Sequence, residues 1–153
     1  MYYKPDPKKL KSVCDIVVKA PEFVRDGEKT YCNLAVRKIL GGIGLDLFYH
    51  EAKKRAMLAN EMIDYMEEQR AKFAKLDDGT DAFLEAKQGI VVIACERGSS
   101  HGHVAVVCPD PMALSGSWGK MVPMLANVGK KNGVMRASLC FQEEPTYYCV
   151  LPF

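Results

Sequence analysis

The spacing of apolar residues changes once along this chain, near residue 89. Before that point apolar positions recur every three or four residues, as they do along one face of an α-helix. After it come runs rich in valine, isoleucine and alanine, which are typical of buried strands. The predicted strands are 90–95, 103–108, 124–128, 134–141 and 147–151. Helices followed by an antiparallel sheet predict an α+β domain whose helices cover one sheet face.

Two helices and one shorter helical segment are predicted in the first part of the chain. The first helix is capped by Thr30 and ends at Gly41-Gly42, which places Cys32 in its first turn. A second helix is expected from about 50 to 75, and the short segment over 82–87. The apolar stripe of the first helix consists of Cys32, Ala35, Val36, Ile39, Leu40 and Ile43.

Length and composition predict one soluble domain. The chain has 153 residues, 48% of them hydrophobic and 26% charged, which is typical of a globular protein with one core. We therefore expect a single domain over 1–153, helical to about 88 and sheet from about 89. The net charge of +2 does not favour nucleic-acid binding, and no apolar segment approaches the roughly 20 residues that membrane insertion requires. Because the first residues do not form the apolar stretch of a secretory signal, we expect export by another route.

The six cysteines contain no C-x-x-C pair, so they predict neither a zinc ribbon nor a thioredoxin motif. Cys95, Cys108 and Cys140 lie in apolar surroundings and are expected in the core. Cys14 and Cys149 are the candidates for a disulfide if the protein works in an oxidising compartment, although the sequence does not pair them.

Cys32 and His103 are the residues that combine into a reactive pair. Unpaired N–H groups and the dipole at a helix start favour a negative charge, so the pKa of Cys32 is expected to fall below about 8.5. His103 opens an apolar strand in which an imidazole has little packing role, and it is suited to take up the thiol proton. The alternative is a structural role for each, with Cys32 as a packed thiol at the start of the apolar stripe.

Two motifs together resemble a known family. Tyr31-Cys32-Asn33 opening a helix, and Gly102-His103-Val104-Ala105-Val106-Val107 opening a strand, resemble the CHAP and NlpC/P60 cysteine amidases and endopeptidases that cut peptidoglycan. The resemblance covers about residues 30–128. It implies a papain-like fold, in which N-terminal helices pack on a C-terminal antiparallel sheet. It also implies the chain order nucleophile, histidine and a third polar residue on the next strand.

The third residue that the resemblance implies is Asn127, which would orient the ring of His103. Asp110 and Glu143 are the competing candidates for this role. Substrate-binding residues are expected around the loop and helix start, namely Trp118, Ser117, Tyr31 and Asn33. His101-Gly102-His103 is a weak metal motif because no second ligand pair accompanies it, so we expect no metal and no cofactor.

The function expected from these residues is hydrolysis of an amide bond in peptidoglycan through a thioester acyl-enzyme. Cys32 is the nucleophile, His103 the base, and the partner is peptidoglycan or its peptide fragments, with a cognate inhibitor protein as a further partner. We expect action on the cell wall outside the cytoplasm, as a phage lysin or an exported antibacterial effector. The alternatives are a non-catalytic wall- or protein-binding module and a papain-like transacylase.

Overall fold

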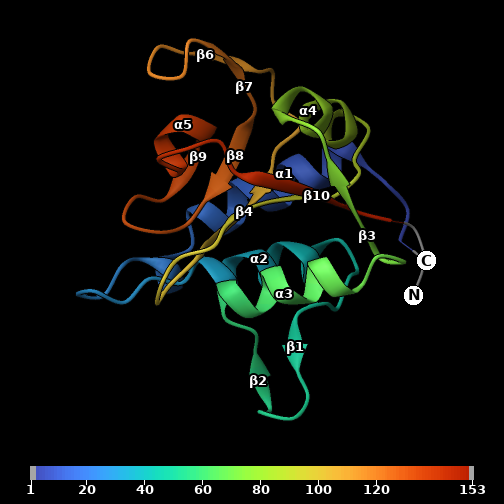
Figure 1. Cartoon of the computed structure of the whole chain (residues 1–153), viewed down its shortest axis with the longest axis vertical. Coiled ribbons are helices and arrows are strands. Elements are labelled where there is room, and N and C mark those ends of the chain that lie inside the picture. Colours follow the sequence, from blue (N-terminus) through green and yellow to red (C-terminus); the bar gives the residue numbers. More distant parts are fainter. Residues whose placement is uncertain (1–2, 152–153) are drawn as a thin grey trace.

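Six strands form the central sheet of this protein, which is described over residues 3–151 by a computed structural model (Figure 1). The strands are β3 Phe73–Leu76, β4 Val92–Glu96, β5 His103–Val107, β8 Met124–Asn127, β9 Gly133–Arg136 and β10 Thr146–Val150. Their order across the sheet is β3-β10-β4-β5-β8-β9, and every neighbouring pair is antiparallel. The predicted α+β class is therefore confirmed.

The sheet divides the core into two parts, because successive strand residues point to opposite faces. In β4, Ile93 and Cys95 pack on one face, whereas Val92 and Ala94 pack on the other. All four side chains are buried, which explains why this strand reads as a continuous apolar run in the sequence.

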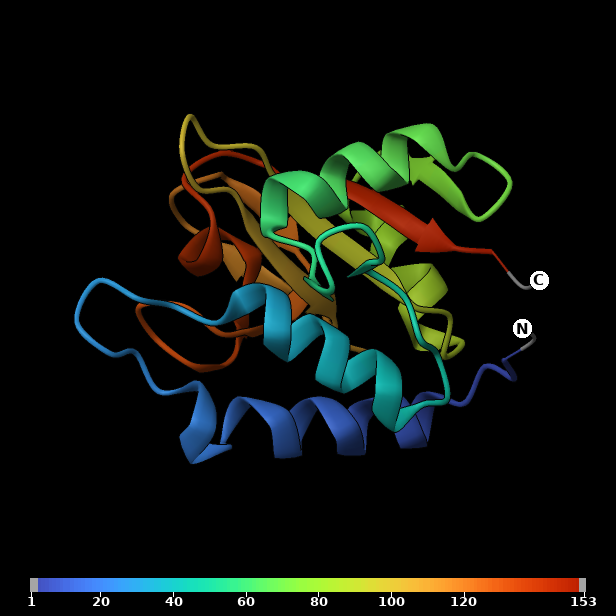
Figure 2. The ribbon, with the colours of Figure 1, turned by 90° about the horizontal axis from the view of Figure 1, so that it is seen from below.

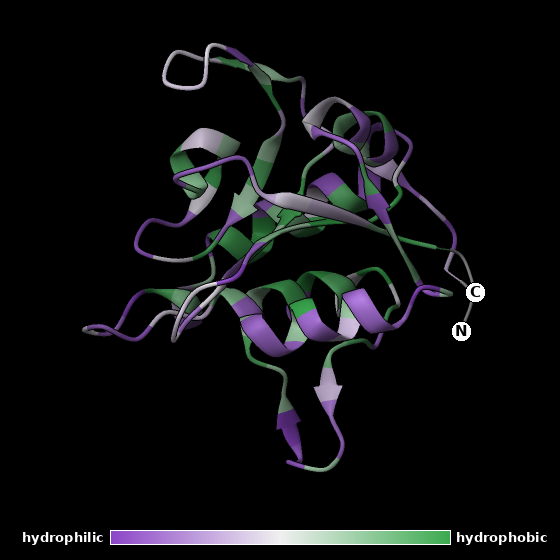
Figure 3. Ribbon diagram, viewed as in Figure 1, coloured by the Kyte–Doolittle hydropathy of each residue, from purple (hydrophilic) through white to green (hydrophobic). Residues whose placement is uncertain are grey.

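Three helices cover the first face of the sheet: α1 Pro7–Val18, α2 Cys32–Gly42 and α3 Ala59–Glu68 (Figure 2). Asp6 caps α1 by accepting a hydrogen bond from the Lys9 backbone N–H at 3.1 Å. In α2 the predicted stripe is buried from Cys32 to Leu40. Figure 3 shows α2 and the central strands in the hydrophobic colour, and much of α3 in the hydrophilic colour. None of the helices in residues 3–151 has both the length and the apolar character that crossing a membrane requires.

The second face is covered as well, which corrects the expectation that helices lie on one face only. Helices α4 Gly79–Lys87 and α5 Ala137–Cys140 pack there, beside a hairpin formed by β6 Ala113–Ser115 and β7 Lys120–Val122. The physical reason is that both faces of β4 and β5 are apolar, so both must be removed from water.

The helix predicted over 50–75 is wrong in its bounds. A hairpin of β1 Tyr49–His50 and β2 Arg55–Ala56 precedes α3, and β3 follows it. Lys54 adopts a left-handed conformation with φ of 52°, which a helix does not allow. Arg55 lies in β2 and forms an ion pair with Glu61 of α3 at 2.7 Å. Beyond α3, Phe73 enters the sheet opposite Val150.

Two other predictions differ in detail from the structure. Segment 134–141 is divided into strand β9 and helix α5, and α1 was not predicted as a helix. The short helix expected over 82–87 is α4, which begins earlier because Asp78 accepts a hydrogen bond from the Asp81 N–H. Thus β3 comes from the part expected to be helical, and α5 from the part expected to be sheet.

All six cysteines are free thiols. Cys95 and Cys108 are buried and Cys140 is partly buried, as expected for core positions. Cys14 belongs to the core on the α1 side of the sheet and Cys149 to the core on the α4 side, so these two candidates do not face each other. The neighbouring Cys14 thiol, together with burial, instead raises the pKa of Cys108, so these two thiols lie close together.

Candidate active site

Cys32 is the first residue of α2, and the sequence thus located it correctly. Tyr31, not the predicted Thr30, is the N-cap, because the Tyr31 carbonyl accepts the first helical hydrogen bond, from the Ala35 N–H. Helix α2 packs against β5. Burial raises the pKa of the Cys32 thiol, while hydrogen bonding from the main chain of Val104 and Asn33 opposes the rise. This direction is opposite to the expected fall of the pKa, since desolvation of the thiolate outweighs the main-chain hydrogen bonds that favour it.

His103 is the first residue of β5 and Asn127 the last residue of β8. Because β5 and β8 are antiparallel neighbours, the start of one lies beside the end of the other. The His103 Nε2 and Asn127 Oδ1 atoms are 2.7 Å apart. Asn127 is one of two buried polar residues found in the described part of the chain. The structure therefore brings these two predicted site residues together.

The Asn127 amide has only one orientation that satisfies its partners. Its Nδ2 donates to the Lys131 carbonyl at 2.8 Å, and a carbonyl can only accept. Oδ1 must then face His103, so the Nε2 atom of the ring carries the proton and donates it to Asn127. In the neutral ring this leaves Nδ1 with its lone pair. His103 is thus held in the tautomer that a base acting through Nδ1 requires.

Phe141 and Gly129 pack against the His103 ring. The ring centroids of His103 and Phe141 are 4.9 Å apart, and the planes are tilted by 51°. A Cβ atom placed on Gly129 would lie 3.4 Å from Cε1 of the imidazole, so this glycine packs closely on the ring edge. Burial lowers the pKa of His103, and the hydrogen bond to Asn127 opposes that shift. The ring is consequently neutral at pH 7.

Cys32 lies beside β5, the strand that begins with His103. Main-chain hydrogen bonding joins its sulfur to Val104, the residue that follows His103. Over residues 3–151 no direct hydrogen bond connects the Cys32 thiol with the His103 ring. The two residues therefore lie on adjoining elements, with a neutral thiol and a neutral imidazole as their resting forms.

The competing third residues lie elsewhere. Asp110 forms an ion pair with Lys11 of α1 at 2.7 Å. Glu143 lines a polar hollow of about 490 Å³ beyond the end of β4, beside Glu96 and Arg97. His101 is exposed on the β4–β5 loop. No group of three potential metal ligands gathers anywhere in the described residues.

All four of the expected substrate-binding residues make contacts within the protein. Trp118 donates from Nε1 to the Gln142 carbonyl at 3.3 Å and packs on the α4-side core. Ser117 hydrogen-bonds through its hydroxyl with Ser115. Asn33 donates from its amide to the Met57 carbonyl at 2.9 Å, so this amide is not free to stabilise an oxyanion. Tyr31 is partly buried, with the Lys29 ammonium 5.6 Å from its ring centroid.

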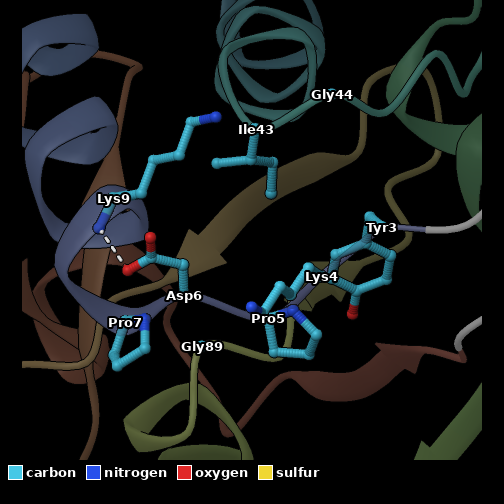
Figure 4. Close-up of a pocket in the computed structure, with 9 residues that line it drawn as sticks. All are labelled: Tyr3, Lys4, Pro5, Asp6, Pro7, Lys9, Ile43, Gly44 and Gly89. Carbon is cyan, nitrogen blue, oxygen red and sulfur yellow. Dashed lines mark hydrogen bonds between the residues drawn. The ribbon is translucent and has the colours of Figure 1, made fainter.

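A second hollow, of about 460 Å³, lies away from these residues (Figure 4). Tyr3, Asp6 and Gly89 line it, together with Ile43 just beyond the last residue of α2. Cys32 is at the first residue of that helix, so about 16 Å of helix separates the two places. This hollow is therefore not part of the candidate active site.

Sequence reasoning missed the residues that shape the surroundings of His103. Phe141 was assigned to a strand, and the contact of its ring with His103 depends on the fold of α5. The role of the Lys131 carbonyl cannot be predicted from the sequence, because every residue has a backbone carbonyl. Gly129 follows the end of a predicted strand, and a glycine at such a position can signal a close approach of the backbone to another group, here the imidazole of His103.

An α+β fold with a cysteine at a helix start, and a His–Asn pair at adjoining strand ends, is consistent with the papain-like class. Similarity to known proteins covers part of the chain. One curated protein, the peptidoglycan amidase Tse1 of Pseudomonas aeruginosa, is 43% identical over 54 residues. That stretch is 35% of this chain and 33% of the relative, so the match spans about a third of the relative. No protein-family model matches the chain.

Proposed function

We propose that this protein hydrolyses an amide bond in peptidoglycan, with Cys32 as nucleophile, His103 as general base and Asn127 as the residue that orients the ring. His103 takes the thiol proton at Nδ1 as sulfur attacks the amide carbonyl carbon. The proton then passes to the leaving amine as the C–N bond breaks, giving a thioester. Water attacks the thioester, the carboxylic acid leaves, and the thiol is restored.

The observation that carries this proposal is the fixed tautomer of His103. A buried histidine with a purely structural role usually has both ring nitrogens paired. Here the Asn127 amide, itself oriented by the Lys131 carbonyl, holds the proton on Nε2 and leaves Nδ1 as an acceptor. The start of α2 with Cys32 adjoins the same strand. The partial similarity to a peptidoglycan amidase supports the choice of polymer. Peptidoglycan lies outside the cytoplasm, so this function assigns the protein's action to that side.

The test is digestion of purified peptidoglycan, with the released fragments identified by mass spectrometry. We expect new amine and carboxyl ends from one type of amide bond, and the site of cleavage distinguishes an amidase from a stem-peptide endopeptidase. Cys32→Ala is expected to abolish the release while keeping the circular dichroism spectrum of the folded protein. Cys140→Ala, a partly buried thiol on α5, is the matched control and is expected to stay active. Activity of Cys32→Ala would contradict the mechanism.

One observation favours a second function. Burial raises the pKa of Cys32, as it does for a packed thiol, and this suits a non-catalytic peptidoglycan-binding module. Alkylation by iodoacetamide with peptide mapping separates the two. For a catalytic pair, modification of Cys32 is expected to slow markedly in His103→Ala. For a packed thiol, its rate is the same with and without the imidazole.

A further inference from the structure

A second asparagine, Asn132, holds the turn that follows Asn127. The hairpin of β8 and β9 closes through residues 128–132, after the final register pair of Asn127 with Gly133. Within this turn, Oδ1 of Asn132 accepts a hydrogen bond from the Gly129 N–H at 2.9 Å. Its Nδ2 donates to the Phe23 carbonyl at 2.8 Å. Asn132 therefore links the turn to a segment more than one hundred positions earlier in the chain.

The two residues that Asn132 joins, Gly129 and Phe23, are both connected with the candidate site. Gly129, held by Asn132, packs on the edge of the His103 ring. The same turn carries the Lys131 carbonyl, which orients the Asn127 amide. Phe23 is the buried last residue of a short 3₁₀ helix, Pro21–Phe23, and the chain continues from there to Cys32 at the start of α2.

From this geometry we infer that Asn132 is a positioning residue for the proposed reaction: it holds the turn so that Lys131 and Gly129 keep His103 in its base-competent tautomer. It touches neither the substrate nor the reacting atoms. The inference rests on the proposed function for its effect on catalysis, but its effect on the His103 ring does not depend on any substrate.

Asn132→Ala removes both hydrogen bonds and is the main test. Nitrogen-15 NMR of the imidazole rings reports which ring nitrogen carries the proton, and the signals of the three histidines are assigned with His103→Ala. In the wild type we expect the Nε2–H form alone. In Asn132→Ala we expect a mixture of tautomers, and kcat on peptidoglycan about ten- to hundredfold lower with KM nearly unchanged. Lys130→Ala, an exposed residue of the same turn, is the matched control and is expected to match the wild type.

Asn132→Asp separates the two ends of the link. A carboxylate still accepts from the Gly129 N–H but cannot donate to the Phe23 carbonyl. We expect its His103 ring to stay closer to the wild-type tautomer than that of Asn132→Ala. Should Asn132→Ala fail to fold, this variant and hydrogen exchange of the wild-type Gly129 amide take its place, with slow exchange expected.

A folded Asn132→Ala protein with the wild-type tautomer overturns the inference, even if the enzyme is active. Fast exchange of the Gly129 amide overturns it as well. Conversely, an inactive wild type whose tautomer shifts in Asn132→Ala refutes the proposed function and leaves the positioning role in place.

Discussion

The orientation of one amide decides which nitrogen of His103 is available as a base. Asn127 is buried, and its Nδ2 faces a backbone carbonyl, which can only accept a hydrogen bond, so Oδ1 faces the ring nitrogen of His103. An amide reversed by half a turn would place Nδ2 against the ring and Oδ1 against the Lys131 carbonyl, two oxygens without a proton between them. Such a contact costs a buried hydrogen bond, so the observed orientation is strongly favoured.

Asn127→Ala is expected to lower kcat on peptidoglycan by about ten- to a hundredfold, because His103 loses the partner that fixes its tautomer. Steady-state kinetics with soluble peptidoglycan fragments measure this. Lys131→Ala is the control: it removes an exposed side chain and keeps the carbonyl, so its activity is expected to be unchanged. Full activity of Asn127→Ala would show that the ring needs no orienting residue.

The pH dependence of activity is expected to depend on Phe141. His103 is a base only when neutral, and burial lowers its pKa below the ordinary 6.5, so activity persists as the pH falls to that lowered pKa. Phe141→Ala admits water to the ring, which raises the pKa towards 6.5 and moves the acid limb of kcat/KM to higher pH. Phe141→Leu, which keeps an apolar cover, is expected to move it less. An unmoved limb in both variants argues against His103 as the group that titrates.

The sequence identifies residues whose place in an element carries a signal, and misses those whose role depends on long-range contact. Cys32 begins an apolar stripe, and His103 and Asn127 stand at ends of apolar strands, so all three are visible in the pattern. Phe141 contacts His103 only because α5 turns the chain back over the sheet. The pKa of Cys32 was predicted in the wrong direction because a helix start is visible in sequence and the depth of burial is not.

Among the elements, α3 holds the loop that leads into His103. Asn60 makes two hydrogen bonds to the backbone of Gly98, donating to its carbonyl at 2.9 Å and accepting from its N–H at 3.2 Å. Asp64, one turn further, pairs with Arg97 at 2.6 Å. Helix and loop are thus joined along one face, as residues four apart allow.

Asn60→Ala is expected to lower the free energy of unfolding by about 1–2 kcal/mol, because two hydrogen bonds are lost and the Gly98 groups turn to water. Urea denaturation followed by circular dichroism measures the change. Ser100→Ala, on the exposed part of the same loop, is the comparison and is expected to leave the stability unaltered. Equal stability of Asn60→Ala and the wild type would mean that the loop is held by other contacts.

Elements with a strong period and clear ends were predicted well, and irregular ones were not. The hairpin of β4 and β5 follows from two apolar runs around a glycine-bounded loop. Segment 50–75 has methionine and leucine at helical spacing, yet only residues 59–68 are helical. Phe48 packs against Tyr65 and Phe73, with ring centroids 5.9 and 5.6 Å apart, and Phe73 belongs to β3 of the central sheet. These contacts join residues that are distant in the sequence, so the bounds of the helix are not set locally.

At the scale of the whole molecule, one sheet is shared by two cores. Val106 and Val107 are neighbours in β5, and each is fully buried in a different core. Since the same strands form a wall of both cores, neither core keeps its packing if the sheet is lost. The α+β class followed from the order of patterns, but the second covered face did not, because the sequence does not say which side of an apolar strand a helix occupies.

Val106→Ala and Val107→Ala are each expected to destabilise the protein by about 2 kcal/mol and to shift one common unfolding transition. Trp118 packs on the α4-side core and reports that core by fluorescence, while circular dichroism reports the helices of both faces. Coincident urea curves from the two probes are expected for both variants. Separate transitions would mean that the two cores unfold independently.

The turn at residues 128–132 orients Asn127 through a main-chain carbonyl, while the side chains of Lys130 and Lys131 point to solvent. Substitution of either lysine leaves that carbonyl in the chain. The charge and shape of the surface near the His103–Asn127 pair can therefore change through these two side chains. The hydrogen bonds that keep the proton on Nε2 of His103 stay the same. Under the proposed function, residues that contact the substrate can therefore vary while the hydrogen bonds that prepare His103 as a base are kept.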